Sequence, residues 1–156
     1  MIGAIIGDIA GSRFEFRNRK TKEFSLLVGR GEEERCCYFT DDTVMTLAVA
    51  QAIIDWRTNG SGDMADLSAA AVRRMQEFGL RYPHAGYGGA FRRWLEESRP
   101  RPYNSWGNGA AICGAVAEAF YGVPNEIRAK AMTFLSQHLA DVLKRVEANF
   151  CQEGEC

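Results

Sequence analysis

The sequence lacks any strong excess of charge. Its 156 residues hold 19 Lys and Arg against 20 Asp and Glu, which gives a formal net charge of −1 at pH 7. Such a chain has no overall field that would draw it to nucleic acid or to an anionic membrane. One basic cluster, from Arg13 to Lys22, is followed by the acidic run 32–34, and we interpret it as a solvated loop. The composition therefore favours neither partner.

Long apolar segments and zinc-ligand patterns are missing as well. No stretch approaches the roughly 20 apolar residues that span a bilayer. The N-terminus has no basic lead-in and Asp8 interrupts its apolar run, so we do not expect a signal peptide. The five cysteines form no CxxC pair and there are only two histidines, which argues against structural zinc. We expect reduced thiols and a cytoplasmic location.

Strand signals are nearly absent, and helical spacing dominates. The sequence predicts a compact multi-helix all-α domain over residues 1–150, followed by a flexible tail at 151–156. Residues 16–38 are predicted to be a long irregular connection. Beyond the N-terminal segment, helices are predicted over about 41–56, 64–82, a short stretch ending near 97, 110–121, and from Pro124 to about 150.

The N-terminal segment has a regular glycine pattern. Apolar residues form a helical stripe, and glycines recur at every fourth position: Ile2, Ile5, Ile6 and Ile9, and Gly3, Gly7 and Gly11. Glycines cost a helix stability unless another backbone packs closely over them. We therefore expect a buried helix that crosses another at short distance. Asp8 lies within it, and we expect its charge to be paired with an arginine or a helix end.

The segment Phe39-Thr40-Asp41-Asp42-Thr43 carries the clearest chemical signal. Thr40 is a good N-cap, and acidic residues in a first turn complement the helix dipole, so helix capping is one interpretation. The alternative is a metal site, because neighbouring carboxylates and a threonine hydroxyl are the oxygen ligands that Mg²⁺ prefers. Glu15, between Phe14 and Phe16, is either a surface residue or an acid that projects into a cleft.

Two glycine-rich loops also carry aromatic residues, and each alone is typical of a turn. Together they would allow backbone to approach a ligand, with Tyr87 or Trp106 stacking on a flat ring. The two loops are Gly86-Tyr87-Gly88-Gly89 and Trp106-Gly107-Asn108-Gly109.

These motifs, in this order, resemble the ADP-ribosylglycohydrolase family, of the dinitrogenase-reductase-activating glycohydrolase type. The segment from Gly3 to Glu15 is similar to the family's opening, and the segment from Phe39 to Thr43 to its first metal-binding motif. Residues 86–91 and 103–111 resemble two further family segments.

The resemblance implies an all-α fold around a two-magnesium centre that hydrolyses the glycosidic bond between ADP-ribose and an acceptor. Thr40, Asp41 and Asp42 would be metal ligands, and Glu15, Asp41 and Asp42 would be the catalytic acids. The ADP-ribose cleft would be lined by Gly86, Tyr87, Gly88, Gly89, Trp106, Gly107, Asn108 and Gly109. Such a metal pair would orient ribose hydroxyls and water.

One departure from the family pattern affects this expectation. Family members carry a second acidic metal motif late in the chain, and no Asp-x-Asp pair follows Ile112 here. The loop that ends at Gly109 is joined directly to a helix that resembles a later family segment, as an internal deletion would produce. With fewer ligands, Mg²⁺ should bind weakly and activity should be impaired. The missing section should also expose apolar surface, which favours self-association.

Two other hypotheses remain at this stage. The chain could be a non-catalytic ADP-ribose-binding or helical self-association module, which would bind ligand without regard to Mg²⁺ or form a dimer. It could also be a helical domain in which Thr40 to Asp42 only cap a helix.

Overall fold

The computed structural model describes residues 2–16, 20–28, 36–59, 63–105, 107, 109, 141, 144, 147, 148 and 150–152. The described chain is helical, with α1 (Ile2–Ser12), α2 (Asp41–Asn59), α3 (Met64–Arg81) and α4 (Gly89–Glu96). Two short strands, β1 (Tyr38–Phe39) and β2 (Cys151–Gln152), pair in parallel. The predicted all-α class is therefore confirmed. None of the described helices is long and apolar enough to cross a membrane.

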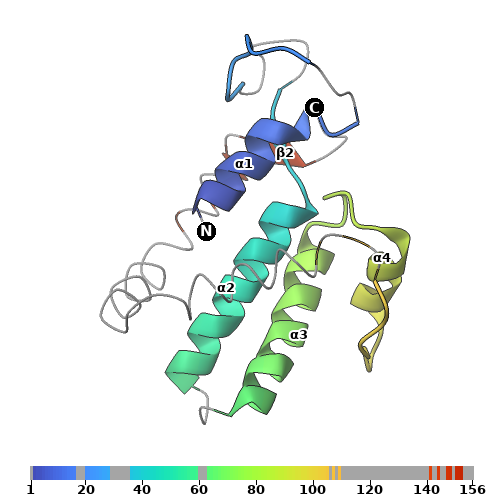
Figure 1. Ribbon diagram of the computed structural model, residues 1–156. Helices are drawn as coiled ribbons and strands as arrows, with labels where there is room; N and C mark the ends of the chain where they lie inside the picture. Colours follow the sequence, from blue (N-terminus) through green and yellow to red (C-terminus); the bar gives the residue numbers. More distant parts are fainter. Residues whose placement is uncertain are drawn as a thin grey trace.

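Helix α2 is the centre of the packing. Residues 43–50 are all buried, and Val44, Leu47 and Ala48 expose 1% or less of their surface. A helix that is buried on every side is enclosed by its neighbours. Figure 1 shows α3 beside α2 along its length, and α1 beyond the first turn of α2, close to β2. The predicted helix 41–56 extends to Asn59 in the structure.

Helix α3 begins and ends where the sequence indicates. The side chain of Asp63 accepts a hydrogen bond from the Ala65 N–H at 3.1 Å, which caps the first turn. The helix ends at Arg81, two residues before Pro83, which cannot continue it. Helix α4 then begins after the turn at Gly86, whose φ of 89° is a conformation that glycine adopts without strain.

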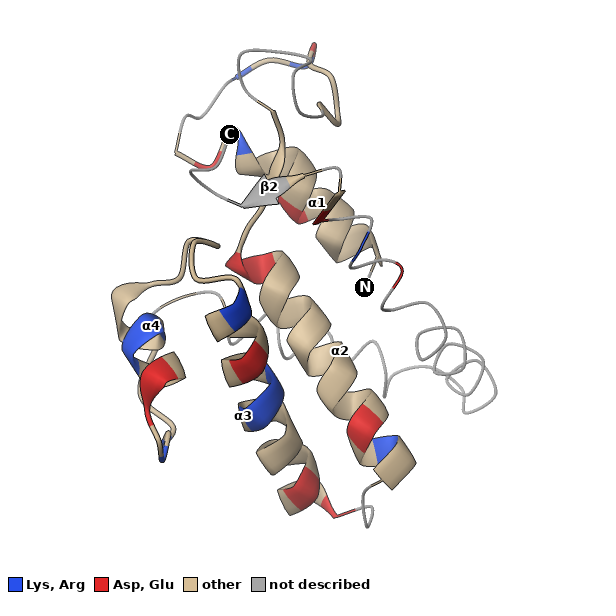
Figure 2. Cartoon of the chain, turned by 180° about the vertical axis from the view of Figure 1, so that it is seen from behind, with Lys and Arg blue, Asp and Glu red and all other residues tan. Residues whose placement is uncertain are grey.

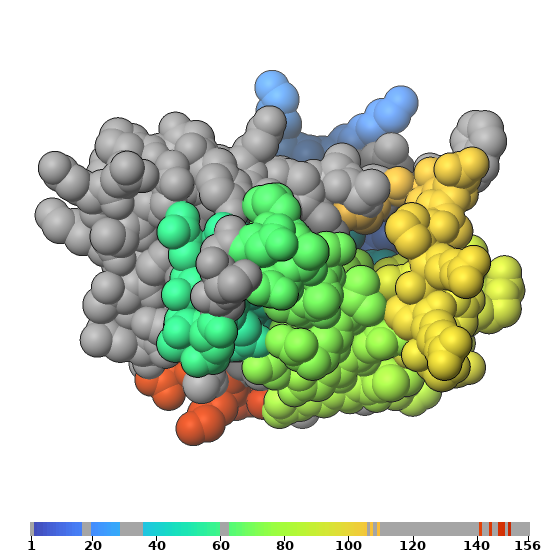
Figure 3. All heavy atoms as spheres, turned by 90° about the horizontal axis from the view of Figure 1, so that it is seen from below, coloured from blue at the N-terminus to red at the C-terminus, as the bar shows by residue number. Residues whose placement is uncertain are grey.

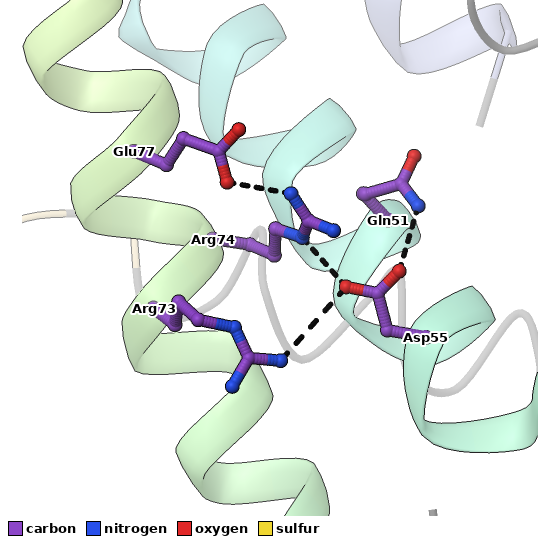
Figure 4. A network of polar contacts seen from close by, with 5 residues as sticks. All are labelled: Gln51, Asp55, Arg73, Arg74 and Glu77. Carbon is purple, nitrogen blue, oxygen red and sulfur yellow. Dashed lines mark hydrogen bonds and ion pairs between the residues drawn. The ribbon is translucent and has the colours of Figure 1, made fainter. Parts of the chain in front are cut away.

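A polar network ties α2 to α3 (Figure 4). Arg74 Nε donates to Asp55 Oδ2 at 2.6 Å, and Gln51 Nε2 donates to Asp55 Oδ1 at 2.9 Å. Burial alone would raise the pKa of Asp55, but these hydrogen bonds hold it below its usual value. The network lies in the later turns of α2, away from its acidic first turn.

The expectation for the glycines of α1 is wrong within the described part of the chain. A Cβ added at Gly3, Gly7 or Gly11 would meet nothing within 4 Å, so no described backbone crosses there. Ile5 and Ile9 are buried, whereas Ile2 and Ile6 are 49% and 43% exposed. The helix therefore packs through one face, and the glycine positions are exposed.

Two further expectations differ from the structure. Cys36 is disulfide-bonded, so the thiols are not all reduced, while Cys37 is free and buried. Cys151 and Gln152 pair with β1, so these two residues belong to a strand rather than to the predicted tail. The helices predicted at 110–121 and from Pro124 onward, and residues 153–156, lie outside the described residues.

Candidate active site

The start of α2 is organised by the carboxylate of Asp8 on α1. Asp8 Oδ1 accepts from Thr40 Oγ1 at 2.6 Å, and Asp8 Oδ2 accepts from the Thr40 N–H at 2.9 Å. Asp8 Oδ2 also accepts from Thr43, through its N–H at 3.2 Å and its Oγ1 at 2.5 Å. Asp8 is thus paired with a helix end, one of the two partners expected from the sequence, and it holds α2 against α1.

Thr40 is an N-cap in the structure. Its Oγ1 accepts from the Asp42 N–H at 3.2 Å while donating to Asp8, and only 4% of the residue is exposed. Its hydroxyl is therefore engaged within the protein. Thr40 does not line the cavity described next, which sets it apart from the two acids that follow it.

Asp41 and Asp42 line a cavity of about 660 Å³, and Figure 2 shows the acidic start of α2 from which they project. Glu15, in the turn after α1, lines the same cavity. The structure thus brings together the three carboxyl groups predicted as catalytic. Glu15 lies 26 residues before Asp41 in the sequence. The hydrogen bonds from Asp8 on α1 to the start of α2 hold these two segments together.

The crowding of acids changes their protonation. Burial raises the pKa of Asp41 to about 7, and the charges of Asp42, Glu15 and Asp8 add to that effect. Burial and the charge of Asp8 also raise the pKa of Asp42. Like charges in a partly buried site disfavour the ionised form. The site is therefore one that a proton or a cation would stabilise.

Both glycine-rich loops contribute to the cavity. Its lining includes Gly86, Gly88 and Gly89 from the first loop and Gly107 and Gly109 from the second. Trp106 and Asn108 lie outside the described residues.

Tyr87 is placed differently from its glycine neighbours. It is buried against Phe91, with ring centroids 5.7 Å apart, and it is not among the residues that line the cavity. Burial and the charge of Asp41 raise the pKa of Tyr87. Its hydroxyl has no hydrogen-bond partner among the described residues.

The apolar part of the lining was not predicted from the sequence. Phe91 and Trp94 stack with centroids 5.3 Å apart and an interplanar angle of 13°, and both face the cavity. Met45 of α2 and Met75 of α3 also line it, as do residues 102–105. The three-residue spacing of Phe91 and Trp94, directly after a glycine-rich loop, was an available signal for a shared helix face.

Oxygen donors suited to a hard cation are present, but they are few. Among the described residues, no group of three or more Asp, Glu, His or Cys is arranged to hold a metal ion. Asp41 and Asp42 remain as adjacent carboxylates. Mg²⁺ is commonly held by one or two carboxylates together with waters and substrate phosphates. The donor set therefore fits one such ion better than a two-ion centre.

Comparison with known proteins identifies the family. The sequence profile of ADP-ribosylglycohydrolase matches residues 1–141. ADP-ribosylhydrolase ARH3 of Xenopus tropicalis is 26% identical over 181 aligned residues, covering 99% of this chain and 50% of the relative. The chain thus spans about half the length of the curated relative it matches. That alignment is longer than the 156-residue chain, so part of it lies opposite gaps here. No solved structure matches the chain significantly.

Proposed function

Because the chain belongs to the ADP-ribosylglycohydrolase family, we propose that its cavity binds ADP-ribose and that its carboxyl groups hydrolyse the bond between ADP-ribose and an acceptor. One observation carries this proposal. A single cavity joins Glu15, Asp41 and Asp42 to the backbone of two glycine-rich loops and to the aromatic pair Phe91 and Trp94. The acidic end of this cavity suits a ribose whose bond to an acceptor is to be hydrolysed. The apolar, aromatic wall suits a flat base.

The reaction would use these groups as follows. Water adds at the anomeric carbon of the ribose while the bond to the acceptor breaks, so one proton leaves the water and one reaches the acceptor. Positive charge develops on the ribose in the transition state. Ionised carboxylates in a partly buried cavity stabilise that charge, and one neighbouring carboxylate takes the proton from the water. Asp8 holds Asp41 and Asp42 in place without entering the cavity.

Magnesium belongs to this proposal. Asp41 and Asp42 would hold one Mg²⁺, whose remaining positions would be filled by water and substrate oxygens. When bound, the ion would supply a Lewis acid that polarises an oxygen of the substrate or of water. We expect weak Mg²⁺ binding and low turnover, because among the described residues no third carboxylate, histidine or cysteine is arranged with Asp41 and Asp42 so as to hold a metal ion.

The test is release of ADP-ribose from peptides modified on arginine or on serine, with and without Mg²⁺. The wild-type chain should release ADP-ribose, and Asp41→Ala should reduce the rate by about 100-fold or more. Asp63→Asn is the matched control, because Asp63 caps α3 and asparagine caps a helix equally well.

The outcomes separate the hypotheses. Binding of ADP-ribose without release would make the chain a binding module rather than a hydrolase. A folded chain that neither binds ADP-ribose nor releases it would contradict the proposal.

A further inference from the structure

One wall of the cavity is a segment with no helix or strand of its own. Pro102, Tyr103, Asn104 and Ser105 follow one another along the lining, and residues 101–105 are irregular. Figure 3 shows this part of the chain, in yellow, on the same face as α3, in green. Such a wall keeps its position only if side chains of the regular elements hold it.

Trp94 of α4 provides such a contact. Its ring lines the cavity and stacks on Phe91, and its indole Nε1–H donates to the carbonyl oxygen of Arg101 at 3.0 Å. Arg101 directly precedes Pro102, and a residue before proline is restricted to extended backbone. A bond to this carbonyl therefore fixes both the starting point and the direction of the wall.

Helix α4 is in turn fixed on α3. Gln76 Nε2 donates to the carbonyl oxygens of Trp94, Leu95 and Glu97, at 3.3, 3.2 and 2.8 Å. These carbonyls lie at the C-terminal end of α4, where the Trp94 oxygen also accepts from the Glu97 N–H at 3.2 Å. Gln76 adds bonds from α3 to this end of the helix. Leu95 lies directly over Gly79 of α3. The indole of Trp94 thus projects from a helix that is held at its C-terminal end.

We propose that Trp94 is a positioning residue whose indole N–H, through its bond to Arg101, holds residues 102–105 against α4 and so sets the width of the cavity. We call this hydrogen bond the latch. A phenylalanine at this position would keep an aromatic ring beside Phe91 but would leave Arg101 without its donor. The identity of the ligand, ADP-ribose, rests on the proposed function, whereas the latch itself does not.

The chain offers a closely matched control for this bond. Trp56 is 8% exposed, as Trp94 is, and its Nε1–H donates to the carbonyl oxygen of Asp63 at 2.8 Å. Both bonds reach a carbonyl seven residues further on. Trp56 does not line the cavity. Trp94→Phe and Trp56→Phe therefore remove the same kind of bond, one at the site and one away from it.

The experiment compares the two variants by hydrogen exchange without ligand and by calorimetric titration with ADP-ribose. Trp94→Phe should speed amide exchange at residues 103–105, and it should weaken ADP-ribose binding by about three- to tenfold, as expected for one lost hydrogen bond. Trp56→Phe should do neither. If Trp94→Phe does not fold, benzothienyl-alanine at position 94 keeps the ring shape without the N–H.

Unchanged exchange at residues 103–105 in Trp94→Phe, or an equal increase in Trp56→Phe, would overturn the latch. Faster exchange with unchanged ADP-ribose affinity would overturn its role in setting the cavity. If the wild-type chain does not bind ADP-ribose, the proposed function fails, and hydrogen exchange alone still decides whether the latch exists.

Discussion

At the scale of single residues, the start of α2 depends on Asp8, whose two carboxylate oxygens accept four hydrogen bonds from Thr40 and Thr43. All four donors point at one side chain on another helix. Asp8 therefore does two things, since it caps α2 and it places a negative charge near Asp41 and Asp42. The repulsion between Asp8 and the two acids of α2 is offset, because the hydrogen bonds of Asp8 stabilise the packing of α1 on α2.

Asp8→Asn should destabilise the fold. Asparagine offers one acceptor oxygen and turns an N–H₂ group toward donors, so hydrogen bonds from Thr40 or Thr43 are lost. We expect a loss of about 2–3 kcal/mol in the free energy of unfolding, measured by urea denaturation. Asp63→Asn, at the N-cap of α3, should change it by less than about 0.5 kcal/mol. Equal effects of the two substitutions would contradict this role of Asp8.

Asp41 should make stability fall as pH rises. Its pKa is 3.8 in the reference state and about 7 in the fold. Between these values the folded chain keeps a proton that the unfolded chain has released, so folding is favoured less at pH 7 than at pH 4. In EDTA, Asp41→Asn should therefore stabilise the chain at pH 7.5, by on the order of 2 kcal/mol, and have little effect at pH 4. Thermal unfolding of both proteins across this range is the measurement, and a difference that does not vary with pH would refute it.

At the scale of elements, the position of α4 on α3 decides the shape of the cavity. Gly79 leaves room for Leu95 of α4, because a Cβ there would lie 2.5 Å from Leu95 Cδ2 and 2.6 Å from Leu95 Cδ1. Leu95 is 3% exposed and has little room to move. The glycine thus allows the docking of a helix that carries Phe91 and Trp94 into the site.

Two glycine substitutions should change the free energy of unfolding in opposite directions. Gly79→Ala should cost about 1–3 kcal/mol through overpacking, although alanine is the better helix former. Gly7→Ala, at an exposed position of α1 with nothing within 4 Å, should instead stabilise by about 0.5–1 kcal/mol. In a Leu95→Ala background the cost of Gly79→Ala should disappear. Denaturant unfolding of the four variants tests this, and persistence of the cost in that background would exclude the contact with Leu95 as its cause.

At the scale of the whole molecule, apolar surface is concentrated after α1. Phe16 is 74% exposed, Leu26 58%, Phe24 49% and Leu27 45%. These residues lie close together in the sequence, and surfaces rich in exposed apolar side chains are typical of places that another chain covers. The chain also spans only half the length of its curated relative. The self-association predicted from the sequence stays a prediction, and this surface is where it can be tested.

We expect concentration-dependent dimers in sedimentation experiments. Replacing Phe16 and Leu26 by serine should raise the dissociation constant by about tenfold or more, because each side chain loses contact area in the dimer. Leu80→Ser is the control, since Leu80 is 55% exposed but lies on α3. A monomer at all concentrations, or an equal effect of Leu80→Ser, would contradict self-association through this surface.

Much of the fold could be predicted from local sequence. Asp63 and Pro83 set the ends of α3, and the largely apolar residues 44–54 indicated the helix α2, because caps, prolines and periodicity act over a few residues. The family and the three acids of the site also followed from sequence motifs, since these motifs are contiguous. The glycine pattern of α1 was misleading, because spacing shows which residues share a helix face but not whether a partner covers that face.

Tertiary structure alone decided how the parts of the site meet. The sequence predicted that Asp8 would pair with an arginine or with a helix end. Only the fold showed that its partner is the start of α2 and that Thr40 is engaged there rather than lining the cavity. The same holds for Trp94 and Arg101, whose contact depends on how α4 docks on α3. Local sequence determines which residues can cap, ligate or stack, because those properties belong to the side chains. Which of them share one cavity depends on the packing of distant segments, a property of the whole chain.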